Sequence, residues 1–494
     1  MSYLVNLTVR YEWLLIFEIV YIIVLILVCL RIVYDTHDNS KTLAYLLLAI
    51  FVPIFGVIFY FSFGINYRKR KMYTKKISED EGLLQKLEDS IIQYSKATFI
   101  EGDEAVQSNK ELAYMLVNDK GSALTSNNAV KLLINGEMKF PEVLKALESA
   151  KHHIHFEYYI YEDDEIGHRI EEVLIRKARE GVEVRFIYDD FGSRSIRKNI
   201  VKRLKKAGVQ AFAFHEIIFI AFANRLNYRN HRKIIIVDGI TGFVGGINVS
   251  DRYINKEKDS KLFWRDTHLR IDGPGVQYLQ TLFIADWNFC SNETLEPDKR
   301  YFPDRKTLPK FGNKVVQIAA SGPDCDTSTI LFSMLQVING AKEEILIATP
   351  YFIPGESIMN ALLVSALGGL KVTLLVPYYS DSVFVNAAAS SYYNELLGAG
   401  VEIYLYTKGF MHAKTMIADR KIAVVGTANM DHRSFELNFE VNAIVYDEEL
   451  SNELRATFIN DLKDSIKIDP VEWEKRPVYK KLLNKIARLV SPML

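Results

Sequence analysis

The sequence predicts an α/β protein made of two α/β sandwich repeats that are related by a pseudo-twofold axis and follow an N-terminal two-helix transmembrane hairpin. Three observations lead to this prediction. A short motif of His, Lys and Asp occurs twice, strand and helix patterns recur in the same order around both copies, and two apolar segments occupy the N-terminus. Matched order across many elements indicates an internal duplication, which two unrelated domains would not explain.

The first expected element is a pair of membrane-spanning helices. Residues 13–33 and 43–63 each approach the ~20 apolar residues that cross a bilayer as a helix. Pro53 lies inside the second segment, where membrane helices tolerate proline. A cleaved secretory signal is the competing interpretation of the first segment, but that segment is too long and a second apolar one follows. We therefore expect a transmembrane hairpin over residues 1–66.

A charged linker helix is expected over residues 67–105, and we assign it no chemistry. The linker begins with a basic cluster, Arg68 to Lys71 together with Lys75 and Lys76. The two apolar segments predict a multi-pass protein of the cell membrane, and the cluster marks the cytoplasmic side, because basic residues concentrate on that side of membrane spans. The same rule places the C-terminal bulk of the chain, with its catalytic domain, in the cytoplasm.

Two repeats are expected over residues 106–310 and 311–470. In each repeat an apolar strand is followed by a helix-like stretch that ends at Gly181 or Gly369, and a second apolar strand then begins. Strands that alternate with amphipathic helices favour an α/β sandwich with a largely parallel sheet in each repeat.

The repeated motif is H-x-K-x4-D followed by an asparagine, which lies 17 residues after the histidine in both copies. The two copies consist of His231, Lys233, Asp238 and Asn248, and of His412, Lys414, Asp419 and Asn429. One such motif is a weak signal. Two copies with matched spacing argue against the alternative that these are core histidines on unrelated strands.

The chemistry predicted from the paired motifs is phosphodiester exchange. His and Lys alternate along a strand, so both side chains point to one face. One neutral imidazole can attack phosphorus and a second, protonated one can serve the leaving alkoxide. The two lysines and the two asparagines are expected to bind the nonbridging oxygens. Asp238 and Asp419 are expected to hold the strand–turn framework rather than to transfer protons.

Composition excludes several other functions. The 61 basic and 61 acidic residues balance, so no global positive field attracts nucleic acid. The three cysteines, Cys29, Cys290 and Cys325, are too widely spaced for a disulfide framework or a thiolate metal site. The histidines form no zinc-binding pattern. We therefore expect chemistry without a metal or a cofactor.

Longer stretches around the motifs carry a family resemblance. They are residues 227–233, 263–268, 348–352, 426–431, 433–435 and 437–440. With the paired motifs, these stretches resemble the phospholipase D superfamily and, over nearly the whole chain, the bacterial cardiolipin synthases. One departure is the corner from Gly245 to Asn248, where the superfamily usually has Gly-Ser-x-Asn, so a hydroxyl is missing here.

The resemblance implies that two phosphatidylglycerol molecules react through a phosphohistidine to give cardiolipin and glycerol. It implies His231 as the nucleophile and His412 as the acid and then the base, although the near-symmetric site leaves the reverse assignment open. In the family an acidic residue after each motif orients its histidine, and the best matches are Asp266 and Glu440.

Three alternatives of different classes stay open. A phospholipase D would hydrolyse the lipid or exchange its headgroup, because water or another alcohol would attack the intermediate. A membrane-tethered nuclease is disfavoured by the zero net charge, and a non-catalytic lipid-binding protein by two complete motifs. The expected partners are phosphatidylglycerol and cardiolipin in an anionic membrane, with no nucleic acid.

Two further segments are candidates for lipid contact. Residues 216–226 form an apolar insertion before the first motif, which either enters the membrane interface or packs inside the protein. Residues 471–494 are expected to form a basic amphipathic helix with Leu482, Leu483 and Ile486 on one face. Such a helix either lies on an anionic membrane or is an ordinary docking helix.

Overall fold

The computed structural model describes residues 2–36, 39–63, 76, 82, 91–214, 228–255, 262–291, 293–305 and 307–490. The chain divides into an N-terminal unit and a body that begins at Lys76. The predicted basic run 68–71 and the predicted apolar insertion 216–226 lie outside the described residues.

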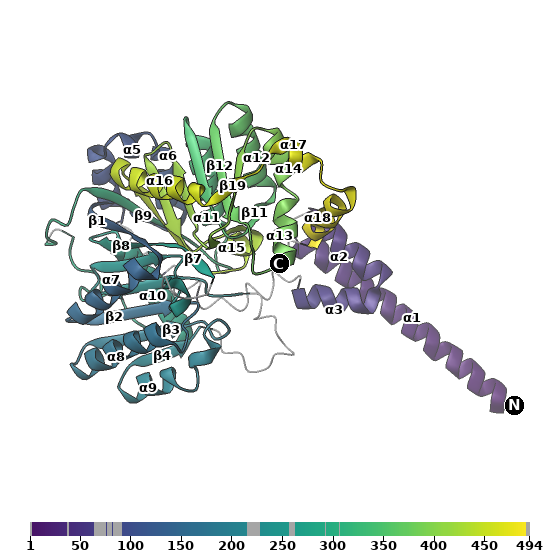
Figure 1. The fold of residues 1–494 in the computed structure, drawn as a ribbon. Coiled ribbons are helices and arrows are strands. Elements are labelled where there is room, and N and C mark those ends of the chain that lie inside the picture. The colour runs from purple at the N-terminus through teal and green to yellow at the C-terminus, as the bar shows by residue number, and fades with distance from the viewer. Residues whose placement is uncertain are drawn as a thin grey trace. The chain divides into compact units, whose positions relative to one another are not determined.

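The N-terminal unit contains one helix that is long and apolar enough to cross a membrane. This helix is α1 (Ser2–Asp35), in which the apolar part is Trp13–Asp35. The predicted second span is not one helix, because it divides into α2 (Asn39–Phe51) and α3 (Pro53–Phe63) (Figure 1). Pro53 lacks an N–H group and its ring clashes with the preceding turn, which ends α2. A side chain at Gly56 would meet the carbonyl oxygen of Leu48 at 2.3 Å, so this glycine lets α3 pack closely on α2.

The body contains two repeats that build one continuous sheet. From one edge to the middle, the strands of the first repeat run in the order β4-β3-β2-β5-β6-β8-β1, and those of the second run outward as β9-β18-β16-β15-β10-β12-β13-β19. The strands of the first repeat are β1 (Thr125–Ile134), β2 (His153–Tyr158), β3 (Glu183–Tyr188), β4 (Gln210–Ala213), β5 (Lys233–Val237), β6 (Thr241–Gly245) and β8 (Thr267–Asp272). Those of the second repeat are β9 (Lys314–Ser321), β10 (Glu344–Ala348), β12 (Lys371–Pro377), β13 (Glu402–Tyr406), β15 (Thr415–Ala418), β16 (Ile422–Gly426), β18 (Glu440–Tyr446) and β19 (Ser465–Lys467). The mirrored order agrees with the expected pseudo-twofold relation.

The expected largely parallel sheets are wrong. Within the continuous sheet, only three strands of each repeat run parallel to one another, namely β2, β3 and β4 in the first and β10, β12 and β13 in the second. The other strands pair in antiparallel fashion, including the motif hairpins β5–β6 and β15–β16. A tight turn after the motif sends the chain straight back along its own strand, and such a connection gives antiparallel neighbours.

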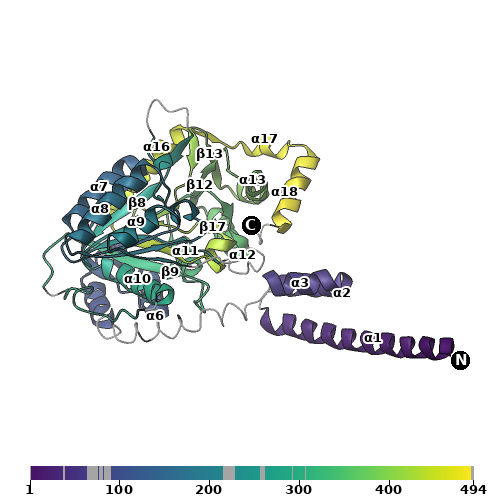
Figure 2. The same cartoon turned by 90° about the horizontal axis from the view of Figure 1, so that it is seen from below.

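Helices cover both faces of the sheet. In the first repeat α7 (Asn135–Ser149), α8 (Glu165–Arg179) and α9 (Ile200–Lys206) pack on one face and α10 (Val276–Cys290) on the other (Figure 2). In the second repeat α11 (Thr329–Gly340), α12 (Gly355–Leu367) and α14 (Tyr393–Gly398) pack on one face, and α16 (Glu448–Lys463) on the other. Each repeat therefore has its own apolar core beside its part of the sheet.

The segment before the first repeat is also helical. Residues 91–101 form a helix, which is followed by α5 (Glu104–Gln107) and α6 (Lys110–Lys120). Asp103 caps α5 by accepting hydrogen bonds from two backbone N–H groups of its first turn. Helix α6 packs on α11 of the second repeat, so this segment is part of the body.

Candidate active site

The motif aspartates hold the turns at the ends of the motif strands. Asp238 and Asp419 adopt left-handed backbone conformations, with φ of 53° and 52°. The carboxylate of Asp238 accepts hydrogen bonds of 2.8–3.0 Å from the N–H groups of residues 151–153. That of Asp419 accepts bonds of 2.7–3.0 Å from residues 342–344. Each aspartate thus ties its hairpin to the neighbouring strand, at the end of the motif strand away from the histidine.

The two histidines are held by carboxylates from the opposite repeat. His231 Nδ1 lies 2.9 Å from Glu440 Oε2, and His412 Nδ1 lies 2.6 Å from Asp266 Oδ2. The two predicted carboxylates thus contact the motif histidines, but each contacts the histidine of the opposite repeat rather than that of its own motif.

Backbone hydrogen bonds between the repeats bring each carboxylate to the histidine of the opposite repeat. The N–H of His231 donates to the carbonyl oxygen of Phe439 at 3.0 Å, directly before Glu440. Equivalently, the N–H of His412 donates to the carbonyl oxygen of Arg265 at 2.7 Å. The short strands β7 (Phe263–Arg265) and β14 (Gly409–Met411) pair in the second case. Each histidine–carboxylate pair therefore needs one residue from each repeat.

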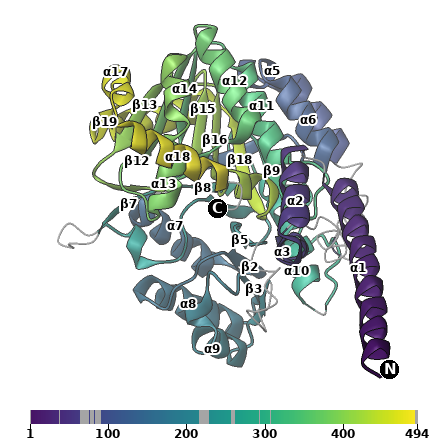
Figure 3. The same cartoon turned by 90° about the vertical axis from the view of Figure 1, so that its right-hand side faces the viewer.

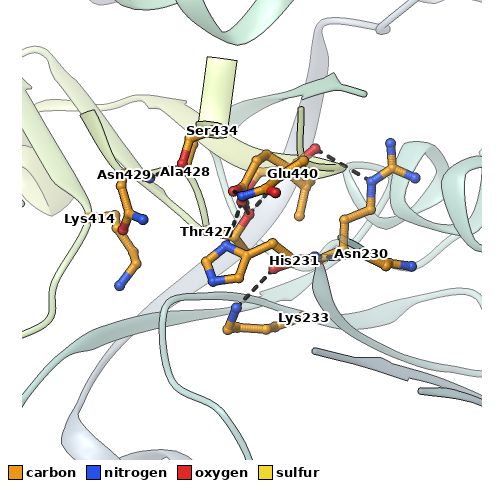
Figure 4. Close-up of polar contacts among 12 residues, drawn as sticks. Asn230, His231, Lys233, Lys414, Thr427, Ala428, Asn429, Ser434 and Glu440 are labelled. Atoms are coloured by element: carbon orange, nitrogen blue, oxygen red, sulfur yellow. Dashed lines mark hydrogen bonds and ion pairs between the residues drawn. The ribbon is translucent and has the colours of Figure 1, made fainter. Parts of the chain in front are cut away.

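Both motif lysines are buried beside the histidines. Lys233 Nζ donates to the carbonyl oxygen of His231 at 2.8 Å, and Lys414 Nζ contacts both the carbonyl oxygen and Nδ1 of His412. Figure 4 shows His231 between Lys233 and Glu440, with Lys414 and Asn429 on the side of the second repeat. Burial lowers the pKa of Lys233 to about 7 and that of Lys414 to about 8, against the opposing effect of the nearby carboxylates.

Burial disfavours the protonated form of both histidines. Burial, reinforced by Lys414, lowers the pKa of His412 to about 3 although Asp266 opposes the shift. Burial also lowers the pKa of His231, against the attraction of Glu440. A bound phosphodiester brings a negative charge next to both imidazoles and therefore raises their pKa values. The site is thus arranged to take up a proton together with an anionic substrate.

A cavity of about 400 Å³ joins the two motifs. Both histidines and both motif asparagines line it, and Asn248 Nδ2 is fixed by a 2.9 Å hydrogen bond to the hydroxyl oxygen of Tyr253. The motif aspartates do not line it. Among the charged residues of the wall, three are arginines, Arg229, Arg252 and Arg433, and two are aspartates, Asp381 and Asp431. Such a cavity suits an anionic group of lipid-headgroup size.

The two asparagine corners differ for a steric reason. Thr427 of the second corner donates its hydroxyl hydrogen to Glu440 Oε2 at 2.5 Å. The matching residue of the first corner is Gly246, where a side-chain carbon would lie 2.2 Å from Asp266 Oδ1. Aspartate is one methylene shorter than glutamate, so the Asp266 carboxylate must sit against the backbone to reach His412. The missing hydroxyl is therefore a consequence of using aspartate at this position.

Substituting Gly246 tests this explanation. Gly246→Ala should push Asp266 away from His412 and lower kcat roughly 10- to 100-fold, the usual effect of losing a group that orients a site residue. Thr427→Ser is the matched control at the other corner, because it keeps the hydroxyl on Glu440, and it should remain close to wild type. Activity measurements on both variants suffice, and unchanged activity of Gly246→Ala would refute the steric explanation.

A buried ion network lies directly behind His231. Arg232 Nη1 lies 2.5 Å from Asp286 Oδ2, and Arg232 Nε donates to the backbone carbonyl oxygen of Glu440. Lys76 Nζ lies 3.3 Å from Asp286 Oδ1 and 3.0 Å from Asp324 Oδ2. Lys76, predicted as part of the membrane-facing basic cluster, is only 1% exposed. The prediction is wrong for this lysine, because two buried carboxylates need its charge.

Several site residues have no place among the sequence predictions. Arg229 and Arg433 line the cavity, and the rings of Tyr159 and Trp264 lie 4.8 Å and 5.3 Å from those of His231 and His412. Arg229 stands two residues before a motif histidine and Arg433 four after a motif asparagine. Their closeness to the motifs is the signal that would have identified them. Within the described residues, no group of His, Cys, Asp or Glu side chains is arranged to hold a metal ion.

Comparisons with known proteins identify the family. Residues 143–287 and 334–462 match the domain family described as cardiolipin synthase, PLD-like domain, and residues 19–64 match the phospholipase D-nuclease N-terminal family. The chain is 41% identical over 479 residues to the major cardiolipin synthase ClsA of Bacillus subtilis, covering 96% of this chain and 98% of that protein. It is 40% identical over 463 residues to the cardiolipin synthase of Listeria innocua, covering 93% and 95%.

A solved structure shares the fold. The phosphatidylserine synthase of Haemophilus influenzae superposes with a TM-score of 0.57 at 14% identity, covering 78% of this chain and all of that one. The sequence matches cover almost the entire length of the chain, and the two mirrored repeats correspond to the two matched domain segments. The chain belongs to the cardiolipin synthase family of phospholipase D-like proteins.

Proposed function

We propose that this protein is a cardiolipin synthase that transfers a phosphatidyl group from one phosphatidylglycerol to another and releases glycerol. The observation that carries the proposal is the pair of histidines on one cavity, each bonded to a carboxylate of the other repeat. Identity of about 40% to curated cardiolipin synthases over most of the chain supports the same assignment.

In the first step, His231 Nε2 attacks the phosphorus of one phosphatidylglycerol. The bond from phosphorus to the glycerol oxygen breaks, and His412 donates its proton to that oxygen, so glycerol leaves and a phosphatidyl-histidine remains. The two lysines and the two motif asparagines bind the nonbridging oxygens and stabilise the charge of the pentacovalent transition state.

In the second step, His412 accepts a proton from the free hydroxyl of a second phosphatidylglycerol. The hydroxyl oxygen attacks phosphorus and the bond to His231 breaks, which releases cardiolipin and restores both imidazoles. The short contact of His412 to Asp266 supports the acid and base role, because a charge-assisted bond stabilises the imidazolium form. Arg229 and Arg433 also line the cavity, and we assign them to binding the phosphate of the second lipid.

The acceptor distinguishes a synthase from a hydrolase of the same family. Purified protein with labelled phosphatidylglycerol vesicles should give cardiolipin and glycerol in equal amounts, with a chelator present and no nucleotide added. His231→Ala protein, prepared in the same way, is the control for contaminating activity. Phosphatidic acid as the main product would assign the protein as a hydrolase, and phosphatidyl alcohols formed from added alcohols would assign headgroup exchange.

We also propose that the protein is a multi-pass protein of the cell membrane and that its catalytic body faces the cytoplasm. Helix α1 is long enough to cross the membrane, whereas α2 and α3, with 13 and 11 residues, would reach only about 20 Å and about 17 Å at 1.5 Å per residue. The multi-pass topology predicted from hydropathy therefore requires α2 and α3 to act together. The basic run 68–71 favours a cytoplasmic body for either number of crossings.

A further inference from the structure

The C-terminal helix displays its apolar face to the outside of the body. Helix α18 (Val478–Val490) carries Leu482, Leu483, Ile486 and Leu489, which are 57%, 58%, 47% and 81% exposed. Where the helix meets the body, Ala487 is 2% exposed. A helix that docks on a soluble domain normally buries its apolar face and exposes its polar one. In α18 this arrangement is reversed.

Polar contacts hold α18 in this reversed orientation. Arg488 Nη1 lies 2.7 Å from Glu395 Oε1, and its guanidinium lies 4.2 Å from the ring centre of Tyr392. Lys481 Nζ lies 2.6 Å from Glu474 Oε1 of α17 (Pro470–Glu474). The body therefore fixes α18 by its charged residues, and leaves the leucine face without a partner among the described residues.

The helix next to α18 contributes residues to the catalytic cavity. Helix α18 packs on α13 (Val383–Ser390), and Figure 3 shows the two helices side by side. At the start of α13, Val383 and Phe384 are 88% and 45% exposed, whereas Ser382 and Val385 line the catalytic cavity. The start of α13, the helix against which α18 packs, thus combines two exposed apolar side chains with two residues that line the cavity.

The charges around the apolar face indicate its partner. Lys480 and Lys485 are exposed. Lys485 lies beside Leu482 and Leu489, three and four residues away along the helix, whereas Lys480 lies past Leu483 on the side of Ala487. Lysines near an apolar face reach the phosphate level of a bilayer while the leucines sit below it. A second protein would more often present complementary carboxylates to such a rim, but the proposed substrate is itself an anionic lipid. An anionic bilayer satisfies the apolar face and the nearby lysines together.

We propose that α18, with the start of α13, is a membrane-docking surface that inserts into the interface of an anionic bilayer and places the mouth of the cavity against the lipid. The inference rests on the proposed function for its substrate, but insertion itself requires no turnover. It gives the lipid a short path, because the headgroup can enter the cavity beside α13 while the acyl chains stay in the membrane.

A probe on the helix tests the insertion in the full-length protein. In a background without native cysteines, Ile486→Cys carrying a polarity-sensitive dye should shift its emission to the blue in phosphatidylglycerol vesicles, and lipids with brominated chains should quench it. The matched control is Val364→Cys on α12, a valine of 70% exposure on another surface, which should be quenched by aqueous iodide instead. Lys480→Gln with Lys485→Gln should lower the inserted fraction in these vesicles, and not in neutral phosphatidylcholine vesicles.

Two results would overturn the proposal. Iodide quenching of the Ile486 probe equal to that of the control would mean that the helix stays in water. A second copy of the protein is the other possible partner of this face. It would be indicated if unlabelled Ile486→Cys proteins formed a disulfide with each other, and if shielding of the dye from iodide increased with the number of protein molecules per vesicle. A protein that inserts α18 and yet makes no cardiolipin would refute only the proposed function.

Measurements of turnover on vesicle and on monomeric phosphatidylglycerol test the proposal independently of the dye. Replacing Leu482, Ile486 and Leu489 with Ser should lower turnover of vesicle phosphatidylglycerol about tenfold or more, because the variant loses the apolar side chains whose transfer out of water drives insertion. Turnover of a short-chain, monomeric phosphatidylglycerol should not change. Val364→Ser with Leu367→Ser removes comparable exposed apolar area from α12 and should affect neither substrate. Equal losses on both substrates would overturn the proposal in favour of a packing role.

Discussion

Replacing either motif histidine should lower turnover by about 10⁴-fold or more, since each variant lacks a nucleophile or an acid that both steps require. The two variants should nevertheless differ in one assay. His231→Ala should form no covalent adduct. His412→Asn should still form a phosphatidyl-histidine from a substrate with an activated leaving group, because such a group departs without a proton. Mass spectrometry of the trapped protein should map the adduct to His231.

The crosswise carboxylates supply the control for this experiment. Glu440→Gln removes the charge beside His231, and Asp266→Asn removes the charge beside His412, while both keep the side-chain volume. Asp266→Asn should impair an activated substrate less than phosphatidylglycerol, since it weakens only the acid. An adduct on His412, with the opposite pattern for the two carboxamide variants, would reverse the roles of the histidines.

Substituting Lys76 should destabilise the body by about 3–5 kcal/mol, the usual cost of leaving a buried carboxylate without its partner. Lys76→Met keeps much of the side-chain volume and removes the charge shared by Asp286 and Asp324. Because Asp286 also holds Arg232, which touches the backbone of Glu440, activity should fall with stability. The midpoint of thermal unfolding in detergent measures the first effect.

Two further variants show whether the stability lost in Lys76→Met comes from its buried ion pairs or from removing a positive charge as such. Lys421→Met removes a lysine paired with Glu104 at the surface, and exposed pairs of this kind contribute little, so its unfolding midpoint should stay at the wild-type value. Lys76→Met combined with Asp324→Asn removes one charge of each sign and should recover part of the loss. A Lys76→Met protein as stable as wild type would show that the network does not depend on this lysine.

Much of the site could be predicted because its chemistry is local in the sequence. His231 and Lys233 stand two residues apart, and the following apolar run and turn are read directly from residue order. The duplication then predicted a second, equivalent half around His412, and the structure places both halves on one cavity. The strand directions were predicted incorrectly, since apolar runs alone do not distinguish a parallel pair from a hairpin.

The sequence by itself determined the family, the paired motifs, the apolar helix α1 and the amphipathic character of α18, because each depends on residue identity and short-range spacing. Only the tertiary structure decided which carboxylate meets which histidine, that Lys76 is buried, and that α18 turns its leucines outward. The physical reason is the same in each case. These contacts join residues far apart in the chain, and their energies depend on burial and on the charges that folding brings together.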